Sequence, residues 1–506
     1  MRVPGETPNP DPCRRLRRVE ASRLTVLLVA VGVLAVACSR GKAQQAGPRL
    51  ALSSCRVEGI EYQTLCGTYE VFEDRVAKQG RKIPLRVVVV PALAASAEPD
   101  PLVLLAGGPG QAATEVTILQ TVDRLHRSRD ILLVDQRGTG GSGALKCAPD
   151  PEGAGLAAKF DDAFREEEFK KCLAGFDADP RLYTTPIAME DLDEVREALG
   201  YEKLNLWGIS YGTRAALVYL RQHPERVRTV VLDGVAPLSL YLPLYMPRDG
   251  QRALDLLFEH CEKDPNCAKA FPELRKRVEA LLEQMAQAPV KVSVQHPLTG
   301  VPEELTLSRH AFLQMMFGQL YSPEIATLVP LMLDRATKGE WAPFIALSQG
   351  VSGGMSSAIS HGMFFSVVCA EDAPFITGEA ITREAKGTWF GEQMVRNMLE
   401  PCKVWPKGTV PEGYREPVTS SVPTLLLSGE LDPVTPPSWG EEAKKTLSNS
   451  LHVVVPGVGH NTVVLGCVQS LMADFVKQGS LEGLKPACGS DLTRPPFFTS
   501  FAGPVP

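Results

Sequence analysis

The sequence has few of the features that mark nucleic-acid-binding, metal-binding or cofactor-dependent proteins. Lys and Arg together number 53 against 59 Asp and Glu, which gives a formal net charge of −6 and a sequence pI near 5.9. Because no basic stripe with interleaved aromatic residues occurs in the sequence, we expect no nucleic acid partner. C-x-x-C and H-E-x-x-H patterns are missing as well, so we expect no metal site and no cofactor.

Long hydrophobic runs are scarce, and the clearest one lies near the N-terminus. The run from Leu24 to Ala37 follows a basic cluster at residues 14–18 and, at about fourteen residues, is too short to cross a bilayer comfortably. This pattern predicts a signal peptide over residues 1–38. Two interpretations of its end stay open. Ala37 suits ordinary signal peptidase cleavage, while Ala37-Cys38 resembles a bacterial lipobox with a lipidated Cys38 as membrane anchor.

The cysteines support export to the bacterial periplasm, cell envelope or medium. Of the 12 cysteines, two lie in the leader, and an even set remains after the tether expected at residues 39–54. An even set in an exported chain indicates disulfides, although the sequence does not fix their connectivity. We expect five bridges between sequence neighbours: Cys55 with Cys66, Cys147 with Cys172, Cys261 with Cys267, Cys369 with Cys402, and Cys467 with Cys488.

A nucleophilic serine is indicated by residues 208–212, Gly-Ile-Ser-Tyr-Gly, which match the G-x-S-x-G pattern. The apolar run 204–207 precedes this pattern and residues 213–220, of helical composition, follow it. A strand, a sharp turn and a helix are the context that a nucleophile elbow requires. Ser210 is therefore the predicted nucleophile, held at the end of a strand with its hydroxyl exposed.

The partners of such a serine follow it along the chain as an acid and then a histidine. Asp432 comes after the strand-like run 424–428, and His460 comes after the run 451–455 on a glycine-flanked loop. His460 can take the serine proton, and Asp432 can orient the imidazole. Glu430 is the competing acid. The other seven histidines are assigned to helices, to a strand or to polar loops.

An oxyanion hole requires two backbone N–H groups aimed at one point. One is expected from Tyr211, the residue after the nucleophile. The other is expected from Gly107 or Gly108, which follow the strand-like run 102–105 and allow close approach of the backbone.

Residues 138–143 match the G-x-G-x-x-G pattern of dinucleotide-binding proteins. That pattern requires a helix to open at once and an acidic residue about 20 positions further on. Residues 144–151 contain two prolines that interrupt any helix. We therefore interpret 138–143 as a loop that braces the site.

Taken together, these motifs resemble the prolyl aminopeptidase and tripeptidyl aminopeptidase group of α/β-hydrolases. Gly-Gly-Pro-Gly at 107–110 and Asp-Gln-Arg-Gly-Thr-Gly-Gly-Ser-Gly at 135–143 each follow a strand-like run, and the elbow, acid and histidine complete the set. The resemblance implies an α/β fold with a mostly parallel central sheet, a largely helical lid inserted after the sixth strand, and removal of residues from peptide N-termini. Ala106 departs from the histidine that prolyl aminopeptidases carry there, which favours the secreted tripeptidyl branch.

The chain divides accordingly into a first core part at 55–236, a lid at 237–415, a second core part at 416–490 and a tail at 491–506. Within the lid, amphipathic patterns predict four helices and a polar hairpin. The helices are expected at 250–263, 272–287, 309–320 and 323–337, and the hairpin at 289–308.

Adjacent lid carboxylates, Glu371 and Asp372, follow a continuous apolar run next to Cys369. An aminopeptidase must recognise a free ammonium group, and lid acids do this in the proteins that the chain resembles. A carboxylate binds an ammonium group through charge-assisted hydrogen bonds. The alternative interpretation is an acidic pair at a helix N-terminus.

The sequence thus predicts an exported serine hydrolase, an aminopeptidase acting on short peptides. Two alternatives stay open: a carboxylesterase with the same triad, and a catalytically inactive binding protein of this fold. The residue preference and the oligomeric state are not indicated by the sequence.

The N-terminus of the mature protein distinguishes the two modes of export. Mass spectrometry of the native product should show that it begins at Cys38 and carries a diacylglyceryl-sized adduct, if the lipobox interpretation holds. An unmodified Cys38 at the N-terminus would favour ordinary cleavage.

Overall fold

The computed structural model describes residues 50–116, 119–147, 155–160, 165–296, 299–486 and 492–504. The leader, with Cys38 and the tether up to residue 49, lies outside these residues, and so does Cys488. The predictions made for those segments therefore stay predictions.

A nine-stranded mixed sheet forms the centre of the fold, in the order β1-β2-β3-β5-β4-β6-β7-β10-β11. The pairs from β1 through β5 are antiparallel, and those from β5 through β4 to β11 are parallel. The mostly parallel sheet is thus confirmed. Its strands are β1 (Ser53–Cys55), β2 (Thr64–Phe72), β3 (Lys82–Val90), β4 (Leu102–Leu105), β5 (Ile131–Val134), β6 (Leu204–Ile209), β7 (Val227–Asp233), β10 (Thr424–Gly429) and β11 (Ser450–Val455).

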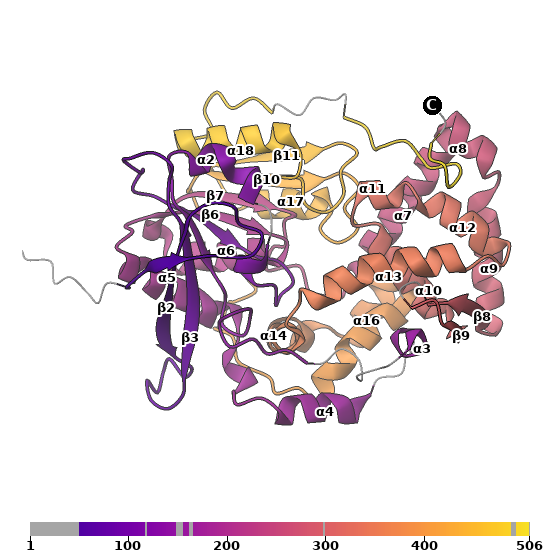
Figure 1. The fold of residues 1–506 in the computed structure, drawn as a ribbon, viewed down its shortest axis with the longest axis horizontal. Helices are drawn as coiled ribbons and strands as arrows, with labels where there is room; N and C mark the ends of the chain where they lie inside the picture. The colour runs from indigo at the N-terminus through magenta and orange to yellow at the C-terminus, as the bar shows by residue number, and fades with distance from the viewer. Residues whose placement is uncertain are drawn as a thin grey trace, which may run out of the picture. The chain divides into compact units, whose positions relative to one another are not determined.

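Helices cover both faces of the sheet, which is why its central strands read as continuous apolar runs. Helices α5 (Thr185–Leu199), α6 (Tyr211–Gln222) and α17 (Pro437–Lys444) contribute to one apolar cluster with the strands. Helices α2 (Asp123–His126) and α18 (Gly466–Gln478) contribute to the cluster on the opposite face (Figure 1). The carboxyl ends of the parallel strands therefore meet at one edge of a rigid layer.

A largely helical insertion separates β7 from β10 (Figure 1). It has an apolar cluster of its own, which includes the fully buried Phe312 and Phe344. The predicted helices and the hairpin are all present, with 323–337 split into two helices. The elements are α7 (Met246–Lys263), α8 (Pro265–Ala270), α9 (Leu274–Gln287), β8 (Val290–Gln295), β9 (Pro302–Leu307), α10 (Arg309–Gln319), α11 (Pro323–Ala326), α12 (Val329–Thr337), α13 (Ala342–Ser357), α14 (His361–Val367), α15 (Gly378–Ala385) and α16 (Gly391–Leu399). The bounds 237–415 expected for the lid stay a prediction.

The expected fold holds, but one more strand precedes the insertion than the sequence indicated. The short strand β1 precedes the strands that the sequence indicated, so the insertion follows the seventh strand along the chain. Its three residues, Ser-Ser-Cys, carry no alternating apolar pattern, and strand β1 forms through backbone pairing with β2 at the sheet edge.

Two further segments join the lid cluster although they lie outside the inserted region in sequence. Leu156 and Phe160 come from helix α3 (Leu156–Lys159) and its end, before β6, and Phe497 comes from the tail. The Phe498 N–H also donates to the carbonyl oxygen of Thr327 at 3.2 Å. The lid core is therefore assembled from three separate parts of the chain. Helix α4 (Glu166–Ala174) lies between α3 and α5.

Four disulfides are present, and each joins the sequence neighbours that were expected to pair. They link Cys55 with Cys66, Cys147 with Cys172, Cys261 with Cys267, and Cys369 with Cys402. Four bridges indicate folding in an oxidising, extracytoplasmic compartment. The fifth pair, Cys467 with Cys488, includes a residue that is not described and stays a prediction.

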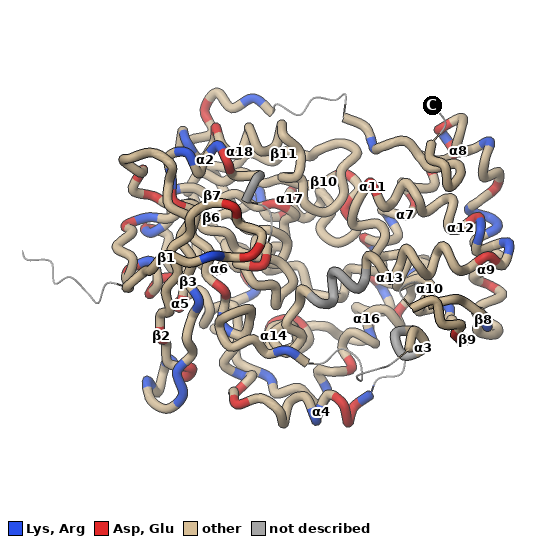
Figure 2. The backbone as a smooth tube through the Cα atoms, in the orientation of Figure 1, with Lys and Arg blue, Asp and Glu red and all other residues tan. Residues whose placement is uncertain are grey.

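Charges of both signs alternate along the outer helices (Figure 2). Many pair within one helix, as Lys170 does with Glu166 and Glu167 on α4 and Arg396 does with Glu392 on α16. Over the described ranges, none of the helices is both long and apolar enough to cross a membrane.

Peptide mapping of the unreduced mature protein should recover the four linked pairs and a fifth linking Cys467 to Cys488. Reduction should lower the melting temperature, because the unfolded chain gains conformational freedom when its cross-links are lost. Free thiols at most of these ten cysteines before reduction would contradict the exported assignment.

Candidate active site

Ser210 occupies the tight turn between β6 and α6, with φ 55° and ψ −122°. A non-glycine residue rarely adopts positive φ, so the surrounding structure must hold this strained backbone in place. The flanking glycines explain how it is held. A Cβ on Gly212 would lie 1.9 Å from the Leu105 carbonyl oxygen, and a Cβ on Gly208 would lie 2.3 Å from that of Gly212. The close approach of β4, β6 and α6 therefore requires glycine at both positions.

Asp432 and His460 follow β10 and β11, two neighbouring parallel strands, and their side chains meet. His460 Nδ1 lies 2.8 Å from Asp432 Oδ2. The other Asp432 oxygen accepts hydrogen bonds from the backbone N–H groups of Val434 and Thr435, each at 2.8 Å. The Thr435 hydroxyl donates to Asp432 Oδ2 at 2.7 Å. These contacts fix the carboxylate, and with it the imidazole ring.

The electrostatic environment of this pair favours the ionised form of Asp432 and the protonated form of His460. Burial opposes ionisation of Asp432, but the His460 charge and the hydrogen bonds from His460, Thr435 and Val434 outweigh it and lower the pKa of Asp432. Burial likewise opposes the imidazolium, yet the charge and hydrogen bond of Asp432, aided by Asp233, raise the pKa of His460.

Asp233, at the end of β7, connects the elbow with the histidine loop. Its carboxylate accepts hydrogen bonds from the backbone N–H groups of Thr462 and Val463 and from the Thr462 hydroxyl, at 2.8–3.0 Å. Its backbone carbonyl accepts from the Ser210 N–H at 2.9 Å. The sequence analysis did not single out this residue. Its place at the end of a strand beside the elbow strand was the available signal.

Ser210 and His460 open together into a cavity of about 850 Å³. Its lining is mostly apolar and comes from both the core and the lid, including Leu242, Met246 and Phe365. Among the described residues that line it, none is Asp, Glu, Lys or Arg. This cavity can therefore accommodate an uncharged organic group next to Ser210.

The two glycines expected at the oxyanion hole also line this cavity. A Cβ on Gly107 would lie 3.4 Å from the Cβ of Ser210, so the Gly107 backbone runs beside the nucleophile. Gly108 has φ +108°, a conformation that L-residues with side chains rarely adopt. Tyr211 follows Ser210 at the start of α6, while its own side chain is buried outside the cavity lining. The oxyanion role expected for the backbone of Gly107, Gly108 and Tyr211 stays a prediction.

Several polar residues of the cavity were missed by the sequence analysis. His361, assigned there to a loop, begins helix α14 and lines the cavity, where burial lowers its pKa. Asn397 and Asn461 line it as well. No motif marks His361 or Asn397, since the path of the lid brings them to this cavity, whereas Asn461 directly follows His460 on its loop.

Glu371 and Asp372 are fully buried and are absent from the described cavity lining. They end the π-helix η5 (Val368–Asp372), which directly continues α14, so they do not open a new α-helix. Burial raises the pKa of Glu371, against the opposing effects of Arg214, Tyr414 and Thr185. The ammonium-binding role that the resemblance implies for these two acids stays a prediction.

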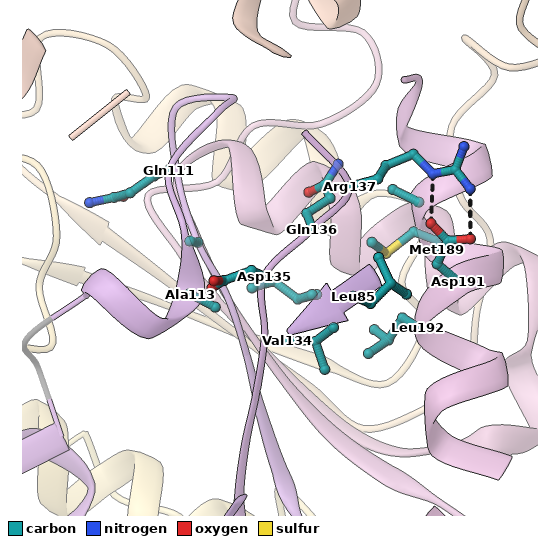
Figure 3. Close-up of a pocket in the computed structure, with 13 residues that line it drawn as sticks. Leu85, Gln111, Ala113, Val134, Asp135, Gln136, Arg137, Met189, Asp191 and Leu192 are labelled. Atoms are coloured by element: carbon teal, nitrogen blue, oxygen red, sulfur yellow. Dashed lines mark hydrogen bonds and ion pairs between the residues drawn. The ribbon is translucent and has the colours of Figure 1, made fainter. Parts of the chain in front are cut away.

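The loop at 135–143 braces the core as expected. Asp135 accepts hydrogen bonds from the Thr114 N–H, the Thr114 hydroxyl and the Gly141 N–H, each at 2.9 Å. Arg137, fully buried, forms a two-pronged ion pair with Asp191 of α5 at 2.6 and 2.8 Å (Figure 3). These bonds attach the loop to its neighbours close to the elbow.

A family model described as the alpha/beta hydrolase fold matches residues 100–466, a range that includes Ser210, Asp432 and His460. The chain belongs to the alpha/beta hydrolase family. This assignment agrees with the sheet order, with the strained serine between β6 and α6, and with the acid and histidine after the last two strands.

Two curated relatives extend over most of this hydrolase. The serine protease Hip1 of Mycobacterium tuberculosis is 26% identical, over 94% of this chain and 99% of the relative. A tripeptidyl aminopeptidase of Streptomyces lividans is 25% identical, over 85% of this chain and 84% of the relative. The solved proline iminopeptidase of Mycobacterium smegmatis covers 81% of this chain at 16% identity, with a TM-score of 0.39. By its family and its two curated relatives, the chain is a serine hydrolase distantly related to the Hip1 serine protease and the tripeptidyl aminopeptidase.

The pH dependence of kcat/KM tests the Asp432–His460 pair. Activity should rise with pH through the pKa of His460, because the neutral imidazole is the base. Since Asp432 raises the pKa of His460 above its ordinary value, Asp432→Asn should move the acid limb to lower pH. It should also reduce kcat by about 10⁴, because the tautomer is no longer fixed.

A matched control is Glu441→Gln, which removes the carboxylate that lies 2.6 Å from His452 Nδ1 on β11. This variant should leave the acid limb in place. An acid limb that stays unchanged in Asp432→Asn would contradict the assignment of His460 as the base.

Proposed function

We propose that the protein is an exported serine hydrolase that cleaves short peptides from a free N-terminus. The observation that carries this proposal is the strained Ser210, which lines the same cavity as His460, whose Nδ1 lies 2.8 Å from Asp432 Oδ2. Similarity to a serine protease and to tripeptidyl aminopeptidases over most of the chain supports peptides as the substrate class. The four disulfides support export.

In the proposed reaction each triad member takes one step. Because Nδ1 of His460 faces Asp432, Nε2 is the nitrogen left to take the proton from Ser210 as its Oγ attacks the scissile carbonyl. The Tyr211 N–H and a glycine N–H of the loop at 107–108 stabilise the resulting oxyanion. His460 then gives its proton to the leaving amine, and water attacks the acyl-enzyme with His460 again as the base.

The cavity sets the size of the substrate. At about 850 Å³ it falls within the range of small-molecule pockets, roughly 300–1,000 Å³. Such a cavity accommodates a short peptide or a comparable acyl group. Its apolar lining favours uncharged side chains beside the scissile bond, because an ionised side chain would lose its hydration there without gaining a partner.

The same lining favours a second candidate, a carboxylesterase with the same triad. A free peptide N-terminus needs a polar partner, and no carboxylate lies among the described residues of the cavity wall. An ester with an apolar acyl group has no such requirement. The third candidate is a catalytically inactive binding protein, which would not need Ser210, Asp432 and His460 in these positions.

A panel of chromogenic substrates decides between these functions. It contains amides of short peptides with free and with acetylated N-termini, beside a short-chain acyl ester. The peptidase proposal expects the free-N-terminus amides to have the highest kcat/KM. Ser210→Ala should abolish turnover of all substrates, and a fluorophosphonate should label Ser210 in the wild type.

Rapid cleavage of acetylated peptides would rule out recognition of the ammonium group. Turnover confined to the ester would move the assignment to the esterase. A fully active Ser210→Ala variant would overturn the triad itself.

A further inference from the structure

The carboxylate of Glu371 lies at the end of a hydrogen-bond chain that starts at the residue after the nucleophile. The Thr185 hydroxyl donates to Glu371 Oε2 at 3.0 Å, and the Thr185 N–H donates to Oε1 at 2.6 Å. Tyr211 lies 2.7 Å from the same hydroxyl. Because the single Thr185 hydroxyl proton goes to Glu371, Tyr211 must be the donor in that contact. Tyr414 adds another hydroxyl donor to Glu371 Oε2.

Asp372 is connected to helix α6 through a separate set of contacts. Arg214, one turn into α6, donates to Asp372 Oδ2 at 2.9 Å and to the Leu240 carbonyl at 2.6 Å. Arg415 donates to Asp372 Oδ1 at 2.6 Å. The backbone N–H of Leu242, a residue of the cavity wall, donates to the same oxygen at 3.1 Å. Asp372 therefore holds the nucleophile helix and one cavity segment together.

The helical segment that carries both acids is itself restrained. Glu371 and Asp372 belong to a single π-helical turn, and such turns often occur at functional sites. Cys369, in the same turn, is bridged to Cys402. Both carboxylates are fully buried and Arg214 is 2% exposed. Buried ion pairs of this kind contribute little net stability, so stability alone does not account for them.

We propose that Glu371 and Asp372 are positioning residues for the hydrolytic reaction: Glu371 acts through Thr185 and Tyr211, and Asp372 acts through Arg214. The two acids set the position of the Tyr211 N–H, the expected oxyanion donor, and of the strained Ser210 beside it. This proposal rests on the Ser210 chemistry of the proposed function but not on the choice between peptide and ester.

The test compares Glu371→Gln and Asp372→Asn with the wild type on a short-chain ester and on a tripeptide amide with a free N-terminus. Each variant should lower kcat at least about tenfold on both substrates, because small displacements of reacting groups cost that much or more. KM should change little, and the rate of fluorophosphonate labelling of Ser210 should fall in parallel. Active-site titration normalises every rate to the folded fraction.

Two buried acids outside this network serve as matched controls. Glu73 accepts from the Tyr183 hydroxyl at 2.7 Å and the Asp179 N–H at 3.2 Å, much as Glu371 accepts from Tyr414 and Thr185. Asp334 pairs with two cations, Arg277 and Lys338, each at 2.8 Å. Glu73→Gln and Asp334→Asn should lower the melting temperature and leave kcat per titrated site unchanged.

A loss confined to free-N-terminus peptides would overturn the proposal in favour of ammonium binding by these acids. A lowered melting temperature with unchanged kcat per titrated site would overturn the proposal and show that the two acids have only a structural role. If Glu371→Gln does not fold, Tyr414→Phe removes one donor to Glu371 and should give a smaller loss of kcat, equal on both substrates. An unchanged kcat in that variant would overturn the Glu371 route.

Failure of the proposed function would give a different experimental result from failure of the positioning roles. If the wild type turned over neither amide nor ester, the peptidase and esterase assignments would both fail. The rate of fluorophosphonate labelling would still report on the position of Ser210, so the role of Glu371 and Asp372 could be judged separately.

Discussion

The site depends on one steric constraint, the close approach of backbones where β6 turns into α6. A single Cβ on Gly212 would collide with the carbonyl oxygen of Leu105 on the neighbouring strand. That closeness forces Ser210 into positive φ and exposes its hydroxyl at the carboxyl edge of the sheet. Asp432 and His460 reach the same edge because their strands run parallel to β6. The chemistry therefore follows from the packing of the sheet.

Buried charges connect this edge of the sheet to the lid and to the loop that carries His460. Arg214 of α6 meets Asp372 of the lid, and Asp233 ties the elbow strand to the loop that carries His460. Taking an ion out of water is costly unless partners replace its hydration. Each of these carboxylates has several hydrogen-bond donors, which meets that requirement. The arrangement fixes the lid segment at 369–372 relative to the nucleophile, while the cavity between lid and core keeps an uncharged wall.

Much of the fold and of the candidate site could be predicted from the sequence, because the signals lie in short stretches of the chain. The elbow, the acid and the histidine each follow an apolar run, so their strand-end positions could be read from short windows around Ser210, Asp432 and His460. The helices and the hairpin of the lid have clear amphipathic periods. The four disulfides of the described residues were expected because their partners are sequence neighbours. Strand β1 was missed because Ser53 and Ser54 carry no apolar signal.

What the sequence by itself determined is therefore the type of chemistry and the order of the elements that carry it. Only the tertiary structure decided what lines the cavity, because His361 and Asn397 are brought there by the path of a long helical insertion. It also decided the surroundings of Glu371. The resemblance implies that this acid binds the substrate, whereas in the structure Thr185 and Tyr414 donate hydrogen bonds to it. These contacts join residues 43 and 186 positions apart, so they depend on packing and no short sequence window records them.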